Sequence, residues 1–377
     1  MKTKIITLIG LFFFSVLTAQ VEKVSVKKAE KLNEVLVKGK RKLKKTLHYE
    51  KIATLKKRVY SFDSHLEDHK IYVFGGDVSS TVNRAKGAID ISGVDFVTFG
   101  QLLKVLRRFG PDHHAYSDKL QIFDLKSGKW LQNKVKLSNR AYHNVNYYKG
   151  DFYVLGGKRL SKNRQIEYLS DKIEIVNKDA LSITVDGTNP HQGINFASTV
   201  YKNYLVVMGG SSKKNARSKV KYSKDSHFFD FTTGLWYELP KMMEAKESKG
   251  ILVRHKFYLI GGYNGEELSG IESFDFVSGE WKREMNLPVA MKKPGLAVSK
   301  ELIYIYDKNV IFVYNTSKNE LQKYYVGLEL AESTLHVDGE NLYILGGFVS
   351  NRFSKEPSGS IYKIALKEFN KTKYFNQ

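Results

Sequence analysis

A short apolar run that ends in two glycines occurs five times along this chain of 377 residues, and this repetition constrains the fold most strongly. Each run is rich in Ile, Val, Leu and Tyr, which favour β-strands. The glycine pairs are Gly75–Gly76, Gly156–Gly157, Gly209–Gly210, Gly261–Gly262 and Gly346–Gly347. Their first glycines are 81, 53, 52 and 85 residues apart, and a period near fifty residues is typical of a propeller or a solenoid.

A second feature recurs downstream of three glycine pairs, where an aromatic residue stands seven positions before a tryptophan. These pairs are Phe123 with Trp130, Phe229 with Trp236, and Phe274 with Trp281. A degenerate copy lies between the last two glycine pairs, where Tyr306 replaces the first glycine and Tyr314 with Leu321 keeps the offset. This copy divides the longest interval into 45 and 40 residues, so the unit occurs six times.

The glycine pairs, the aromatic residues and the spaced tryptophans together resemble the kelch repeat, with six units over about residues 47–377. In that family each repeat is one blade of a ring-shaped β-propeller. The resemblance therefore implies an all-β fold, a six-bladed kelch-type β-propeller with four-stranded blades. Physical reasoning agrees, because one such sheet cannot bury both faces, whereas blades stacked around an axis can. We expect the repeated Gly, Phe and Trp residues to be structural and assign them no binding chemistry.

Two segments are candidates for closing the ring. Residues 47–58 match residues 129–140 in register, and the latter lead from a predicted outer strand into the next blade. On this basis residues 47–55 add the outer strand of the last blade and leave no open sheet edge. Residues 371–377 are the alternative. The internal match favours the N-terminal segment.

Residues 1–19 have the pattern of a Sec signal peptide, with a basic start, an apolar run over 5–17 and Ala19 before the expected cleavage site. An uncleaved anchor is the alternative, although a mostly apolar run of thirteen residues is short for spanning a bilayer. Because the chain has no Cys, lipoprotein anchoring is excluded. Residues 17–20 also resemble the ends of signal peptides of secreted Bacteroidetes proteins. We therefore expect a periplasmic or extracellular protein.

Residues 20–46 form a basic leader that we expect to be extended. Residues 21–58 carry fourteen Lys and Arg against four Glu, and like charges at this density repel one another. Attraction to an anionic or membrane surface and a solvated linker are the two interpretations, of which we favour the linker. Residues 32–41 also resemble the short segment that precedes the plug of TonB-dependent outer-membrane receptors, which bears only on the compartment.

The first repeat contains an insertion over about residues 78–116. Thr98–Gln101 fits a helix capping box, and the apolar residues that follow have helical spacing up to Gly110–Pro111. The pattern predicts one short helix over residues 98–109. Because it is basic and amphipathic, such a helix can contact a membrane surface or a partner, although we favour packing on its own domain.

Two basic pairs in this insertion are candidate binding residues. Arg107 and Arg108 lie on the predicted helix, and His113 and His114 follow it. Adjacent histidines rarely bind one metal ion well, and no third ligand has suitable spacing. We expect loop residues that contact a ligand, and no metal site.

The charge of the chain predicts the kind of partner. Lys and Arg outnumber Asp and Glu by 61 to 39, which gives a formal net charge of +22. This balance predicts an anionic partner, which we expect to be an acidic glycan, an envelope surface or a protein. Nucleic acid suits the charge, but the expected signal peptide argues against it. We expect a monomer.

The segments that follow the glycine pairs are unusually basic. The kelch resemblance implies that they share a face with the loops that lead into the inner strands, which hold Arg140, His191, Lys246, Lys292 and Lys293. Their charges would add up to a cationic funnel around the channel, with a solvated charged face as the alternative. The candidate binding residues are Arg107, Arg108, His113, His114, Arg140, Arg159, Arg164, His191, Lys213, Lys214, Arg217 and Arg352.

The absence of Cys limits the chemistry of this chain. It excludes thiol nucleophiles and thiolate metal sites, and also the chemistry of galactose oxidase, whose kelch-type propeller needs a Tyr–Cys cofactor. Periplasmic sialic-acid mutarotases of the N-acetylneuraminate epimerase type are also six-bladed kelch proteins, and this function is the alternative. No phosphate-binding loop, zinc-binding helix or nucleophile elbow is present. We therefore assign no catalytic residue and no cofactor, and predict a binding or scaffolding module.

Overall fold

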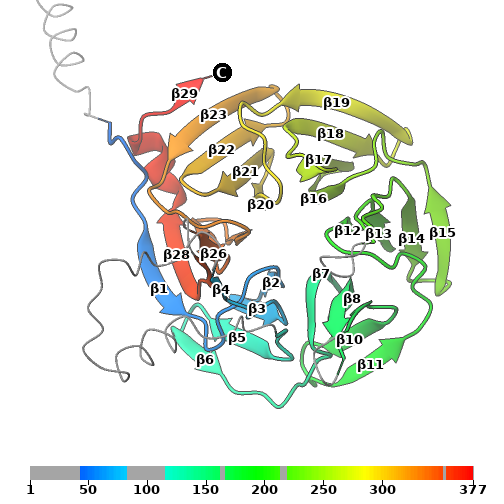
Figure 1. Cartoon of the computed structure of the whole chain (residues 1–377). Helices are drawn as coiled ribbons and strands as arrows, with labels where there is room; N and C mark the ends of the chain where they lie inside the picture. The colour runs from blue at the N-terminus through cyan, green and yellow to red at the C-terminus, as the bar shows by residue number, and fades with distance from the viewer. Residues whose placement is uncertain (1–42, 83–114, 162–165, 213–218, 351–353, 377) are drawn as a thin grey trace, which may run out of the picture. The chain divides into compact units, whose positions relative to one another are not determined.

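The computed structural model describes residues 43–82, 115–161, 166–212, 219–350 and 354–376. Lys45–Gln377 form one compact unit, in which six antiparallel sheets stand in a ring (Figure 1). This arrangement confirms the predicted all-β, six-bladed propeller. In these ranges the only helix is the 3-10 helix η2 at Leu366–Lys371, and none is long and apolar enough to span a membrane. The expected signal peptide, most of the leader and the expected helix at 98–109 lie outside the described residues.

Within each blade the strands follow one another outwards from the centre of the ring (Figure 1). Blade 1 consists of β2 (Asp63–Glu67), β3 (Lys70–Phe74), β5 (Leu120–Asp124) and β6 (Lys129–Leu131). Blade 2 consists of β7 (Arg140–Tyr148), β8 (Asp151–Leu160), β10 (Ile173–Asn177) and β11 (Ile183–Asp186), with β9 (Glu167–Leu169) beside β8. Blade 3 consists of β12 (Ala197–Tyr201), β13 (Tyr204–Met208), β14 (Ser226–Asp230) and β15 (Leu235–Leu239).

The other three blades repeat this order. Blade 4 consists of β16 (Glu247–Val253), β17 (Lys256–Tyr263), β18 (Gly270–Asp275) and β19 (Glu280–Asn286). Blade 5 consists of β20 (Gly295–Ser299), β21 (Leu302–Asp307), β22 (Val310–Asn315) and β23 (Glu320–Tyr325), with β29 (Phe375–Asn376) beside β23. Blade 6 consists of β24 (Thr334–Val337), β25 (Asn341–Leu345), β28 (Ser360–Ala365) and β1 (Glu50–Thr54). A small extra sheet joins β26 (Phe348–Ser350), β27 (Ser354–Pro357) and β4 (Thr81–Val82).

The glycine pairs stand where the second strand of a blade meets a neighbouring segment closely. Gly156 and Gly157 both have left-handed backbone angles, with φ of 68° and 78°. A Cβ on Gly156 would lie 2.1 Å from the ring of Phe196, and one on Gly157 would lie 2.4 Å from the carbonyl oxygen of Ala141. Only glycine combines this backbone conformation with this close approach.

The seven-residue offset between the aromatic residue and the tryptophan is the register of the hairpin between the third and fourth strands. Phe123 stands opposite Trp130, Phe229 opposite Trp236, and Phe274 opposite Trp281, with ring centroids 5.0, 5.3 and 5.2 Å apart. In blade 5, Tyr314 stands opposite Leu321 in the same way. Aromatic cross-strand pairs of this kind stabilise a sheet.

The hydrophobic core lies between the blades. Six clusters of buried apolar residues are found in the described part of the chain, and each is shared by two neighbouring blades. For example, Ile71 and Phe123 of blade 1 belong to the same cluster as Tyr343 and Ile361 of blade 6. Each blade therefore depends on its neighbours for the burial of its apolar surface, as expected for repeats that are not stable alone.

The N-terminal segment closes the ring, as the sequence predicts. Glu50 pairs with Lys363 and Thr54 with Ser360, so β1 is the outer strand of blade 6. The backbone N–H of Leu55 adds a hydrogen bond to the carbonyl of Gly359 at 2.7 Å. Residues 371–377, the other candidate, do not form the outer strand of blade 6. Instead, β29 pairs with β23 of blade 5.

Candidate functional site

A cavity of about 450 Å³ occupies the centre of the ring. The inner strands of all six blades line it, namely β2, β7, β12, β16, β20 and β24. Pockets of this size accommodate small molecules. The residues that define this channel are therefore far apart in the sequence and brought together only by closure of the ring.

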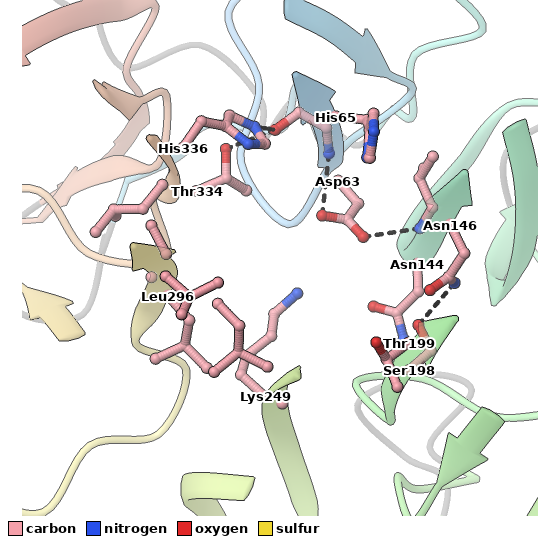
Figure 2. Close-up of a pocket in the computed structure, with 18 of the residues that line it drawn as sticks. Asp63, His65, Asn144, Asn146, Ser198, Thr199, Lys249, Leu296, Thr334 and His336 are labelled. Atoms are coloured by element: carbon pink, nitrogen blue, oxygen red, sulfur yellow. Dashed lines mark hydrogen bonds between the residues drawn. The ribbon is translucent and has the colours of Figure 1, made fainter. Parts of the chain in front are cut away.

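One side of the channel is polar. Its residues come from blades 6, 1, 2 and 3 and include Asp63, Ser64, Asn144, Asn146, Ser198, Thr334 and His336 (Figure 2). Ser64 Oγ lies 2.8 Å from both Thr334 Oγ1 and His336 Nε2, which joins blade 1 to blade 6. The Asp63 carboxylate accepts a hydrogen bond from the Val145 N–H at 2.7 Å, which joins blade 1 to blade 2. These contacts hold the polar side in one arrangement.

The other side of the channel is aliphatic. Ile251 and Leu252 of β16, together with Leu296 and Val298 of β20, line the cavity there. Blades 4 and 5 therefore present an apolar surface to the same space into which blades 1 to 3 and 6 present hydroxyl, amide and carboxylate groups. A ligand that fills this space needs both kinds of surface.

Two histidines near the polar side are neutral at ordinary pH. Burial lowers the pKa of His65 to about 4, although the charge of Asp63 opposes this effect. Burial, together with the neighbouring His65, lowers the pKa of His336 to about 3. These rings therefore contribute hydrogen-bonding groups and no positive charge.

Lys249 on β16 is the cation of the channel. It lines the central cavity and also a smaller pocket of about 20 Å³ at one end of it. In Figure 2 its ammonium group lies between Leu296 and the polar residues. Within the described ranges, this ammonium group makes no hydrogen bond or ion pair. The Lys249 ammonium is therefore a positive charge in this cavity that is available to bind an anionic ligand.

Four of the residues that line the smaller pocket share one backbone feature, and we call them the mouth residues: Ser61, Tyr142, Asn195 and Glu332. They belong to blades 1, 2, 3 and 6 and lie at the start of the inner strands. All four have left-handed backbone angles, with φ of 46°, 63°, 54° and 52°. This conformation costs about 1–3 kcal/mol for Ser61, Tyr142 and Glu332, whereas asparagine adopts it readily.

Hydrogen bonds between blades hold the mouth residues in place. The Tyr142 N–H donates to the Ser61 carbonyl at 2.7 Å, and the Asn195 N–H donates to the Tyr142 carbonyl at 3.2 Å. This series of backbone hydrogen bonds continues to blade 4, where the Ser248 N–H donates to the Asn195 carbonyl at 3.0 Å. The backbone of one blade thus positions the side chain of the next.

The carboxylate of Glu332 is a charged centre at the mouth. It accepts a hydrogen bond from Ser61 Oγ at 2.6 Å and forms an ion pair with Lys293 at 3.2 Å. Burial acts to raise the pKa of Glu332, but the ammonium groups of Lys293 and Lys355 outweigh it and lower the pKa to about 2. Glu332 is therefore ionised at physiological pH.

Aromatic rings and lysines alternate around the mouth. The ring of Tyr142 has the ammonium nitrogens of Lys158 and Lys293 at 4.8 and 4.9 Å from its centroid. Its hydroxyl donates a hydrogen bond to Asp77 at 2.8 Å. Lys355 lies 4.0 Å from the ring of Tyr60. These cation–π contacts restrict the orientation of the tyrosine rings and of the lysine side chains beside them.

The structure describes three of the twelve candidate binding residues. Arg140 is buried inside blade 2, where it lies 2.9 Å from Glu174. Arg159 is half-buried and pairs with Asp171 at 3.0 Å. His191 is buried and donates from Nε2 to the Gly209 carbonyl at 2.8 Å. The other nine lie outside the described residues: Arg107, Arg108, His113, His114, Arg164, Lys213, Lys214, Arg217 and Arg352.

The described lysines of the expected funnel are mostly neutralised by neighbours. Lys246 is fully buried and pairs with Glu272 at 2.9 Å, and Lys293 pairs with Glu332. Lys292 lies 3.7 Å from the ring of Tyr263. In this part of the chain no group of three or more Asp, Glu or His side chains is placed to hold a metal ion.

Sequence reasoning missed the mouth residues, although a signal was present. Each lies fourteen positions before the first glycine of its repeat, since 61, 142, 195 and 332 precede 75, 156, 209 and 346 by the same number. The same offset leads to Glu247 in blade 4, which accepts a hydrogen bond from Asn195 Nδ2 at 2.8 Å. Polar residues at one fixed position of every repeat were the pattern to look for.

The ring of six blades, with glycine pairs and aromatic hairpins repeated in register, defines a kelch-type propeller. A family model described as the KLHDC2/KLHL20/DRC7 Kelch-repeats domain matches residues 110–314, more than half of the chain. The protein belongs to the kelch-repeat family.

Similar proteins from other organisms also carry kelch repeats. The chain is 24% identical over 188 residues to Kelch repeat and BTB domain-containing protein 2 of cowpox virus (strain Brighton Red), covering 49% of this chain and 32% of that protein. It is 25% identical over 168 residues to human Kelch-like protein 38, covering 41% of this chain and 29% of that protein. The chain thus spans less than a third of the length of these relatives.

Proposed function

We propose that this protein is a binding module that presents the mouth of its propeller to a protein partner. The observation that carries the proposal is that four blades supply the mouth residues at one position of the repeat and that these residues line one pocket. Left-handed non-glycine residues also occur in the turns after the inner strands, among them Lys202, Arg254 and Lys300, so the proposal rests on the pocket that the mouth residues share. Membership of the kelch-repeat family agrees with an interaction module.

The composition of the mouth also suits protein recognition. Tyr142 and Tyr263 are half-buried and each has a lysine ammonium over the ring, and the half-buried carboxylate of Glu332 supplies an acceptor. Interfaces are enriched in aromatic side chains, which bury a large area and fix orientation through a polar group. A partner would meet a surface whose rotamers are already restricted.

We propose further that the partner is acidic and that the protein acts in the periplasm or outside the cell. The net charge of +22 supports the first statement, and the pattern of residues 1–19 supports the second. Attraction between a basic module and an acidic protein accelerates association and is screened by salt.

The test places a photo-crosslinking amino acid at Asn195 on the mouth and, as a control, at Lys300, which lies at the opposite end of the inner strand β20. In cells of the source organism, we expect one acidic protein to be trapped from position 195 and not from position 300. With that protein purified, Tyr142→Ala should weaken binding at least tenfold, while Lys300→Ala should leave it unchanged.

Three results would overturn the proposal. They are equal trapping from both positions, no effect of Tyr142→Ala on binding, and catalysed interconversion of sialic acid anomers by the purified chain. The last result would instead support the mutarotase alternative.

A further inference from the structure

We propose that the central channel binds a small monocarboxylate with an aliphatic body, and that Lys249 holds its carboxylate. This inference is independent of the proposed protein partner, because it rests on the residues inside the channel and not on the aromatic and charged groups around the mouth.

The first argument is the charge of Lys249. Nearby lysines have acidic partners in the fold: Lys246 lies 2.9 Å from Glu272, and Lys293 lies 3.2 Å from Glu332. Lys249, by contrast, has no ion pair or hydrogen bond from its ammonium group to the described residues, although it is partly buried in the cavity wall. Partly burying an unpaired charge is unfavourable, and an anion beside it removes the penalty.

The acids near Lys249 are already engaged. Asp63 accepts hydrogen bonds from the backbone N–H groups of Ser64 and Val145 at 3.0 and 2.7 Å. Glu332 is bound to Ser61 and Lys293. No carboxylate among the described residues is therefore left to complement Lys249, and we assign that part to a bound ligand.

The second argument is the division of the channel into two sides. Lys249 lines the same cavity as the aliphatic side chains of Ile251 and Leu296, and in Figure 2 its ammonium group points from the side of Leu296 towards the polar residues. A carboxylate at the Lys249 ammonium would leave the rest of a ligand against the aliphatic side. The volume of about 450 Å³ is sufficient for a small organic acid.

The same features disfavour two other anions. A phosphate carries up to two charges and several acceptor oxygens, and it is usually bound by several donors, whereas one ammonium is unpaired here. A sugar acid carries hydroxyl groups all around its ring, so those that do not face the polar side would lie against the aliphatic side chains of Ile251, Leu296 and Val298, which offer no hydrogen-bonding group. A singly charged acid with an apolar body satisfies both sides of the channel.

Calorimetric titration of the full chain with sodium octanoate tests this inference. We expect saturable binding with one site, at least tenfold weaker in Lys249→Met and within threefold of the wild type in Lys249→Arg. Lys300→Met, which removes an exposed lysine on a turn at the far end of β20, is the matched control and should bind as the wild type does. The neutral 1-octanol, N-acetylneuraminate and inorganic phosphate are titrated in parallel.

Thermal unfolding of the variants distinguishes a loss of octanoate binding from a loss of the folded structure. Because the Lys249 ammonium has no partner among the described residues, Lys249→Met should unfold at the same temperature as the wild type or higher, so a loss of binding is not a loss of structure. Octanoate that fails to bind the wild type, or binds Lys249→Met equally well, overturns the site. Tighter binding of 1-octanol, N-acetylneuraminate or phosphate than of octanoate overturns the ligand class.

Discussion

Arg140 and Glu174 form an ion pair of 2.9 Å inside blade 2, with side chains that are 1% and 7% exposed. Arg140 also donates to the Val154 carbonyl at 2.9 Å, and Glu174 accepts from the Ser138 N–H at 2.7 Å. Removing one partner of such a pair leaves a buried charge uncompensated, which costs about 3–5 kcal/mol. We therefore expect Arg140→Met to lower the free energy of unfolding by about this amount, measured by urea denaturation with tryptophan fluorescence.

The matched control for this pair is the double variant Arg140→Met with Glu174→Leu. Because it removes both charges together, it should be more stable than Arg140→Met alone. Equal stability of Arg140→Met and the wild type would show that the pair is not structural, and the binding role predicted for Arg140 would then deserve a direct test.

The glycine pairs allow steric overlap to be separated from backbone strain. Gly156 and Gly128 have nearly the same φ, 68° and 66°, but a Cβ on Gly156 overlaps Phe196, whereas a Cβ on Gly128 has nothing within 4 Å. Gly128→Ala should cost about 1 kcal/mol from backbone conformation alone. Gly156→Ala should cost about 3 kcal/mol or more, because overlap in a packed site is added. Similar unfolding midpoints for the two variants would contradict the packing argument.

The pairing of β1 with β28 predicts an asymmetry between the two ends of the chain. A chain that starts at Lys56 lacks β1 and exposes the edge of β28, so we expect a lower unfolding temperature and concentration-dependent aggregation. A chain that ends at Tyr374 lacks β29, which adds two residues outside a complete blade, and should unfold close to the full chain. Calorimetry and light scattering compare them. An N-terminal truncation as stable as the C-terminal one would show that the latch is dispensable.

The buried histidines predict loss of stability in acid. In the unfolded chain a histidine takes up a proton near pH 6.5. In the folded chain His65 and His336 resist protonation, because burial lowers their pKa values to about 4 and about 3. Above pH 6.5 these histidines are neutral in both the folded and the unfolded chain, so they do not change the free energy of unfolding. As the pH drops from about 6.5 towards 4, only the unfolded chain takes up the protons, and the free energy of unfolding falls.

The pH dependence of the urea midpoint checks this expectation. His336→Gln should bind about one proton fewer on unfolding between pH 6.5 and 4, and the slope of stability against pH should decrease accordingly. His48→Gln, at an exposed position, is the control and should keep the slope of the wild type. An unchanged slope in His336→Gln would mean that His336 is protonated normally in the folded protein.

Much of the fold could be predicted from local patterns. The offset between Phe123 and Trp130 is the register of one hairpin, and the match of residues 47–58 to 129–140 indicated the strand that closes the ring. These features depend on residues close together in one repeat, or on the similarity of one repeat to another. The channel could not be predicted in this way, because Asn144, Lys249 and Leu296 belong to three blades and meet only when the ring is closed.

Lys246 and Lys249 show where the limit lies. From sequence alone they are two basic residues, three positions apart, at the start of the same inner strand. In the structure Lys246 is fully buried against Glu272, while Lys249 lines the channel without an ionic partner in the described part of the chain. The number of blades, the positions of the glycines and the closing strand could be inferred from the amino-acid sequence, since they follow from periodic local interactions. Which charges are neutralised became visible only in the folded chain, because that depends on partners that distant strands bring within a few ångströms.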